Sequence, residues 1–139
     1  MLIVLGVITL LAGIALALTL RVENQSKENA LANVFTLLKS ALEEYYDFKG
    51  EFPAGMGGQT LYAALDSVPA SHEVLKRIDS VWLYPPGRQP GPSLPRIYDP
   101  WGTPLSYRYV PSVDSFPEIV SAGPDKQFGT ADDISTKDK

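Results

Sequence analysis

The sequence predicts an α+β fold in which one long N-terminal helix packs on a small antiparallel β-sheet. Three observations predict this fold. Residues 1–49 have the pattern of a single helix, segments 105–110 and 116–121 alternate between apolar and polar residues, and loop-forming residues fill much of the remaining chain. With 139 residues, the chain is long enough for one modest domain beside that helix.

Residues 1–20 are almost entirely apolar, with no charge and only two threonines as polar side chains. Twenty helical residues extend about 30 Å, which matches the hydrocarbon thickness of a bilayer. The run is longer than the usual core of a cleaved signal peptide and has no basic stretch before it. We therefore expect residues 1–20 to be the transmembrane half of the helix, with a cleaved secretory signal as the alternative.

Residues 21–49 continue the helix as its amphipathic half. Apolar side chains recur at intervals of three and four residues between Leu31 and Tyr45, and charged residues occupy the opposite face. No proline or glycine interrupts this stretch, whereas Gly50 and Pro53 follow it. One uninterrupted helix about 70 Å long is therefore expected, with its second half lying on a globular head.

The head, residues 50–139, is expected to be rich in loops. Short helical patterns cover residues 60–65 and 71–78, and Ser71 is expected to cap the second of them. Residues 85–96 contain five prolines and two glycines, which predicts an extended or turning loop.

The two alternating segments are expected to pair as antiparallel strands. They cover residues 105–110 and 116–121 and are separated by a short polar connection. Pro117 lacks a backbone N–H, so it predicts that the second strand lies near an edge of the sheet.

Composition argues against several classes of function. A net charge of −4 without a dense basic cluster gives no attraction for nucleic acid, and the absence of cysteine excludes thiolate chemistry. His72 is the only histidine and is expected on the surface at a helix start. Glu43 and Glu44 are neighbours on a helix and point about 100° apart, so they do not form an acid and base pair. We therefore do not expect an enzyme.

An acidic loop lies near the end of the chain. Asp125, Asp132 and Asp133 bracket a six-residue segment that contains Gly129. Carboxylate and carbonyl oxygens suit calcium, whereas zinc prefers histidine or cysteine. The loop does not follow the EF-hand pattern, because Gln127 stands at the third position and no bidentate glutamate follows. From spacing alone, a surface turn without metal is the favoured interpretation.

Three stretches of the sequence resemble the type IV pilin-like proteins. LIVLGVITLLAGIAL is similar to the pilin N-terminal helix, and ALEEYYDFKGEFPAG is similar to the segment where that helix ends. YDPWGTPLSYRYV is similar to the DPWG segment that leads into a strand of the major pseudopilins of type II secretion systems. This last stretch is the most specific, and with the acidic loop it places the resemblance in the major pseudopilin group.

The resemblance implies a calcium site. In major pseudopilins, a loop with the pattern S-x-G-x-D followed by a pair of acids holds one Ca²⁺. Ser121, Gly123 and Asp125 match the first part. The resemblance therefore implies four metal ligands, which are the side chains of Asp125, Asp132 and Asp133 and the backbone carbonyl of Ala122. This implication reverses the preference for a plain surface turn.

The resemblance also implies a structural role. Such a subunit is held in the inner membrane by a single span with its head in the periplasm, and it polymerises through its N-terminal helix into an extracytoplasmic pseudopilus. Its partners would be copies of itself, other pseudopilins, inner-membrane components of the secretion system and membrane lipid. The alternative is a membrane-anchored minor pilin or binding module that does not form the filament shaft.

The sequence departs from this family at its start. Family members carry a phenylalanine and a glutamate just before the stretch that corresponds to Met1 and Leu2, and a basic leader before those. We expect the sequence to begin inside the family's mature helix. Arg21 and Lys27 flank the apolar run, and the positive-inside rule alone would favour a cytoplasmic head. The family's leader would reverse that charge balance, so a periplasmic head is expected.

Overall fold

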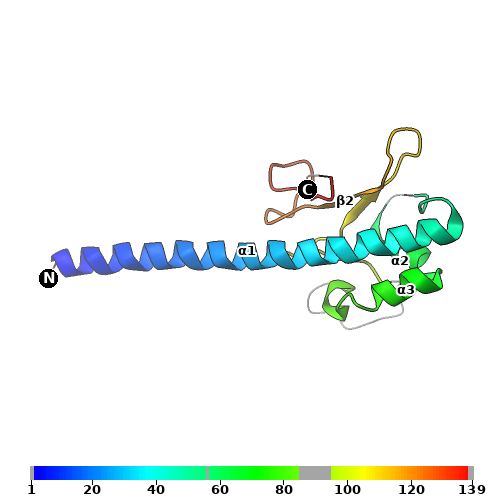
Figure 1. The fold of residues 1–139 in the computed structure, drawn as a ribbon. Coiled ribbons are helices and arrows are strands. Elements are labelled where there is room, and N and C mark those ends of the chain that lie inside the picture. The colour runs from blue at the N-terminus through cyan, green and yellow to red at the C-terminus, as the bar shows by residue number, and fades with distance from the viewer. Residues whose placement is uncertain (1, 56, 85–94, 138–139) are drawn as a thin grey trace.

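The computed structural model describes residues 2–55, 57–84 and 95–137, apart from the side chains of residues 2 and 15–21. The predicted α+β fold is confirmed, since a long helix is combined with a small antiparallel sheet (Figure 1). The elements in chain order are helix α1 (Leu2–Lys49), helix α2 (Gly58–Asp66), helix α3 (Pro69–Leu75), a 3-10 turn (Ser80–Trp82) and strands β1 (Ser106–Arg108), β2 (Glu118–Ser121) and β3 (Ile134–Ser135).

Helix α1 is a single helix of 48 residues, as the uninterrupted pattern predicts. It ends where Gly50 takes a positive φ of 77° and donates its N–H to the Tyr46 carbonyl at 2.7 Å. Only its second half is surrounded by the rest of the chain. The first half projects away from the head (Figure 1).

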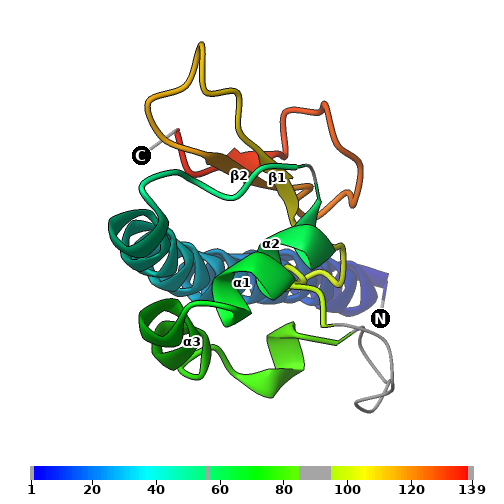
Figure 2. The same ribbon diagram turned by 90° about the vertical axis from the view of Figure 1, so that its right-hand side faces the viewer.

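The head packs around the second half of α1. The sheet lies on one side of the helix and α3 on the opposite side, as Figure 2 shows. The predicted apolar stripe forms the core, together with side chains of α2, α3 and the sheet. Its buried helix residues are Leu31, Val34, Phe35, Leu38, Ala41 and Leu42. Their spacing puts them on one face of the helix, so a single apolar stripe packs against the head.

The sheet has three strands in the order β1-β2-β3, and both pairs are antiparallel. Tyr107 lies opposite Ile119, which confirms the predicted pairing of the two alternating segments. The expectation that the second strand lies near an edge is wrong, because β3 pairs along its other side. Pro117 is compatible with this central position because it immediately precedes β2, where no ladder N–H is needed.

Helix α3 begins earlier than the sequence pattern suggests. It starts at Pro69, and Val68 is the N-cap residue. The expected capping role of Ser71 is therefore wrong. Ser71 is instead fully buried, and its hydroxyl donates to the Ala41 carbonyl of α1 at 2.8 Å. Most of the predicted loop at residues 85–96 lies outside the described residues.

Among the helices as far as the structure describes them, none carries a stretch both long and apolar enough to cross a bilayer. The expected transmembrane half, residues 1–20, includes Met1 and the side chains of Leu2 and residues 15–20, which lie outside the described part.

Candidate functional site

The predicted metal ligands lie in the connection between β2 and β3, residues 122–133, which we call the acidic loop. Asp125 is exposed, and its Oδ1 accepts a hydrogen bond from the Gln127 N–H at 2.9 Å. Asp133 is half-buried, and its Oδ2 accepts from the Gly129 N–H at 2.7 Å. Local hydrogen bonds to backbone donors therefore orient two of the three carboxylates.

The start and the end of the acidic loop meet at Gly123. This residue has a φ of 65°, and a Cβ added to it would collide with the carbonyl oxygen of Asp132. Glycine is therefore required here for its backbone conformation and for lack of space. The glycine of the S-x-G-x-D pattern thus lies against the backbone of Asp132, the first residue of the acidic pair.

A buried carboxylate joins the acidic loop to the turn that precedes β1. Asp99, the first residue of the DPWG stretch, is only 3% exposed. Its Oδ1 accepts from the N–H groups of Trp101 at 3.1 Å and Thr103 at 2.8 Å. Its Oδ2 accepts from the Ser121 hydroxyl at 2.7 Å. Ser121 Oγ in turn accepts from the Gly123 N–H at 3.1 Å. A chain of hydrogen bonds therefore runs from the DPWG turn to the closure of the loop.

The DPWG stretch is visible in the sequence, but no role for Asp99 was predicted from it. An aspartate followed by proline, then by tryptophan and glycine, does signal a turn that its own side chain stabilises. The partner hydroxyl of Ser121, however, lies 22 residues further along the chain. No local pattern reveals a bond between positions so far apart.

The loop's donor chemistry fits a calcium ion. It offers carboxylate and carbonyl oxygens, which are the ligands that calcium prefers. Asp133 Oδ1 is buried and has no hydrogen-bond partner among the residues that the structure describes. A buried unpaired carboxylate oxygen is unfavourable unless a cation or water meets it. Ala122, whose carbonyl is the predicted backbone ligand, is fully buried.

A hollow of about 280 Å³ separates the acidic loop from α1. Asp132, Asp133 and Glu28 contribute the acidic part of its lining, and Phe35 and Ile134 contribute the apolar part. Within the described residues, no three side chains of aspartate, glutamate, histidine or cysteine gather closely enough to hold a metal ion. A calcium ion here would therefore need backbone carbonyls or water besides carboxylates. The calcium site stays a prediction.

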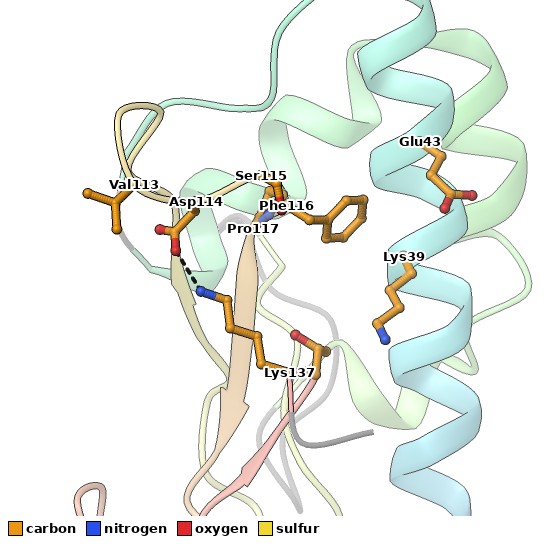
Figure 3. A pocket seen from close by; sticks show the side chains of 9 residues that line it. Lys39, Glu43, Val113, Asp114, Ser115, Phe116, Pro117 and Lys137 are labelled. Carbon is orange, nitrogen blue, oxygen red and sulfur yellow. Dashed lines mark hydrogen bonds and ion pairs between the residues drawn. The ribbon is translucent and has the colours of Figure 1, made fainter.

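A larger groove, about 510 Å³, lies between α1 and the connection from β1 to β2 (Figure 3). Lys39 and Glu43 line it from α1, and Asp114 and Lys137 form an ion pair across its opposite wall at 2.6 Å. The hydrogen bond from Lys137 holds the pKa of Asp114 below its ordinary value. No histidine is among the residues that line the groove, so it offers no general base of that kind.

The first half of α1 forms a different kind of surface. Every residue from Ile3 to Ile14 is exposed. Apart from the adjoining backbone of the helix itself, a Cβ added to Gly6 or Gly13 would meet no atom of the described residues within 4 Å. Eight large apolar side chains of this segment are between 50% and 83% exposed, namely Ile3, Val4, Leu5, Val7, Ile8, Leu10, Leu11 and Ile14. We call residues 3–14 the apolar rod.

The fold of this chain is similar to that of a known protein. Among solved structures, it is similar to the crystal structure of the major pseudopilin from the type 2 secretion system of enterohaemorrhagic Escherichia coli. The chain is similar to a major pseudopilin. The identity is 22%, the match covers 82% of this chain and 85% of the other, and the TM-score is 0.47. No protein-family model and no curated protein matches the sequence.

Proposed function

We propose that the protein is a structural subunit, rather than an enzyme, that polymerises through the N-terminal half of α1 into a pseudopilus of a type II secretion-like system. The observation that supports this proposal most strongly is the apolar rod. Eight large apolar side chains are exposed on a helix segment that nothing else in the described chain covers.

An exposed apolar surface of this kind is stabilised by burial against another molecule. Leaving apolar area in water costs about 25 cal/mol per Å², and contiguous exposed apolar patches beyond a few hundred Å² mark association surfaces. Apolar residues on every side of the rod, rather than along one stripe, suit a helix surrounded on all sides. In the proposed subunit, membrane lipid surrounds the rod before assembly, and copies of the same rod surround it in the filament.

The composition of the rod suits close packing between copies. Gly6, Ala12 and Gly13 lack long side chains, so neighbouring backbones can approach there. A rod that meets different surfaces on successive copies makes heterologous contacts, and contacts that do not close into a ring produce an open helical fibre. The head, which folds around the other half of α1, then lies outside the bundle of rods.

The sequence motifs suggest which filament this is. The DPWG stretch and the acidic loop resemble those of major pseudopilins, whose heads lie in the periplasm after insertion in the inner membrane by a single span. Other pseudopilins and inner-membrane components of the secretion system are then further partners. The proposed calcium ion would draw together Asp125, Asp132 and Asp133, which form no cluster in the described structure, with the Ala122 carbonyl, and so stabilise the head.

Assembly is the decisive test. The complete precursor is expressed with its assembly machinery, and sheared fibres are compared for the wild type, Leu10→Glu and Val113→Glu. Leu10 lies in the rod and is 66% exposed, whereas Val113 lies in the β1–β2 connection and is 80% exposed. We expect Leu10→Glu to abolish fibres, because it places a charge within the bundle, and Val113→Glu to retain them.

The outcomes separate the alternatives. Normal fibres from Leu10→Glu would show that the rod is not the assembly surface. A wild type that stays monomeric with its machinery present would favour a membrane-anchored minor pilin or binding module. Both variants should be equally helical as monomers, because neither side chain contacts the core.

The calcium proposal has a separate test. Thermal unfolding of the full chain in mild detergent is followed during titration with Ca²⁺ or Mg²⁺. A ligand that binds only the folded state at a hundredfold excess over its Kd stabilises it by about 2.7 kcal/mol. We expect such stabilisation with Ca²⁺ and much less with Mg²⁺, and its loss in Asp133→Asn. No response to Ca²⁺ would remove the ion from the proposed function.

A further inference from the structure

We propose that Asp99 is a positioning residue for the acidic loop, and that it sets the start of the loop through Ser121 before any cation binds. The predicted effect on calcium affinity rests on the proposed function. The predicted effect on the conformation of the loop concerns the metal-free protein and does not depend on calcium.

Asp99 is itself held firmly by the DPWG turn. Besides the two N–H groups bound to its Oδ1, the Asp99 N–H donates to the Thr103 carbonyl at 2.8 Å, and the Gly102 N–H donates to the Asp99 carbonyl at 3.0 Å. The turn is also tied to α1, since Trp101 Nε1 donates to Asn24 Oδ1 at 3.5 Å. A buried carboxylate with this many fixed donors has little freedom to move.

Ser121 transmits this position to the acidic loop. It is fully buried at the last position of β2, and its hydroxyl uses both functions, donating to Asp99 and accepting from Gly123. Gly123 is the residue that lies against the Asp132 carbonyl. The hydrogen-bond chain therefore ends where the start and the end of the loop meet.

This arrangement divides the loop into two parts. The part fixed from Asp99 contains Ala122, whose carbonyl is a predicted ligand, between the two bonded residues Ser121 and Gly123. The remaining part, residues 125–132, is exposed and is held by hydrogen bonds within the loop itself. Asp99 thus fixes the part of the site that contains Ala122. A cation would have to order only residues 125–132.

Two variants test the link, and a third serves as a matched control. Ser121→Ala removes the bridging hydroxyl. Asp99→Asn keeps the shape of the side chain and the acceptor for the turn, but replaces the oxygen that accepts from Ser121. Ser71→Ala removes another fully buried hydroxyl, which donates to a carbonyl at the comparable distance of 2.8 Å but lies in α3.

The primary measurement is amide hydrogen exchange of the full chain in calcium-free detergent solution. The readout is at Lys126 and Gly129, whose N–H groups bond to the Gly123 carbonyl and to Asp133 and do not contact the substituted residues. We expect Ser121→Ala and Asp99→Asn to accelerate exchange there about tenfold relative to the wild type, and Ser71→Ala to leave it unchanged.

A calcium titration of the same proteins provides the second readout. We expect the Kd to rise about tenfold in Ser121→Ala and Asp99→Asn and to stay unchanged in Ser71→Ala. Unchanged exchange at Lys126 and Gly129 in both loop variants, or equal acceleration in all three variants, would overturn the proposal. If the wild type does not bind calcium but exchange follows the expected pattern, the metal proposal fails and the positioning role stands.

Discussion

The two halves of helix α1 have the same backbone conformation but opposite surroundings. From Leu31 onward the helix buries one stripe under the head, and Leu38 and Leu42 are completely covered. From Ile3 to Ile14 every residue is exposed, including leucines of the same size. The backbone hydrogen bonds of the helix do not distinguish these halves, so side-chain pattern alone decides which surface the chain covers for itself.

The difference shows how sequence pattern separates folding from association. A stripe at intervals of three and four residues can be covered by one neighbouring layer, and the head supplies it. Apolar residues on all sides cannot be covered by one layer of this small head. In the proposed function, lipid or other copies of the chain cover them, so the first half of the helix carries assembly.

The sharpest test of this comparison is a pair of identical substitutions, one in each half. Leu38→Ala should lower the free energy of unfolding of the head by about 2–5 kcal/mol, because it leaves a cavity in the core. Leu10→Ala, at a side chain that is 66% exposed, should change it by no more than about 0.5 kcal/mol. Denaturant unfolding of the full chain in mild detergent measures both. Similar losses would show that the two halves are not independent.

A smaller effect is expected at the sheet that covers the second half of α1. Tyr107 is 2% exposed, and its hydroxyl donates to the Pro53 carbonyl at 2.8 Å. Tyr107→Phe leaves that buried carbonyl without this donor and should destabilise the head by about 1–2 kcal/mol. Tyr46→Phe is the control, because Tyr46 is 45% exposed. Unfolding measurements at neutral pH should separate the two variants.

Tyr107 also predicts how the head responds to alkaline pH. Burial raises the pKa of its hydroxyl above the ordinary value of a tyrosine. The stabilisation is therefore complete below the unfolded-state pKa, near 10, and is lost as pH rises through the higher folded-state pKa. Between these two values the slope is at most about 1.4 kcal/mol per pH unit. Tyr107→Phe should show a shallower alkaline loss of stability than Tyr46→Phe. Equal slopes would contradict the assignment.

The smallest effect is expected at the groove beside the covered half of α1. The hydrogen bond from Lys137 lowers the pKa of Asp114, so this pair stabilises the head at pH values above the unfolded-state pKa of aspartate, near 4. The contribution is lost as pH falls through the lower folded-state pKa. Asp114→Asn should therefore weaken the acid dependence slightly relative to the wild type. Thermal unfolding between pH 2 and 6 makes the comparison, and identical profiles would show that the pair is without effect.

The parts of the fold that local pattern determines were predictable from the sequence. The length of α1 follows from apolar spacing and from the absence of glycine and proline between residues 14 and 49. The pairing of β1 with β2 follows from alternation on both sides of a short connection. β3 was not predicted, because two residues after an acidic turn are too few to show any alternation.

The features that escaped prediction depend on partners distant in the sequence. Ser71 resembles a helix cap locally, but its hydroxyl bonds to Ala41, which lies 30 residues earlier. The candidate metal site was likewise predictable only in part. Closely spaced aspartates were visible in the sequence, and only the resemblance favoured calcium over a turn. The link from Asp99 to Ser121 and the buried oxygen of Asp133 required the three-dimensional structure.

The straightness of α1 has a mechanical consequence. A tension applied along the projecting end of the helix runs through a continuous ladder of backbone hydrogen bonds to the head, without a proline hinge on the way. The buried stripe lies parallel to that direction, so its side chains would resist sliding together rather than give way one at a time. A load on the base of the molecule would therefore reach the head almost undiminished.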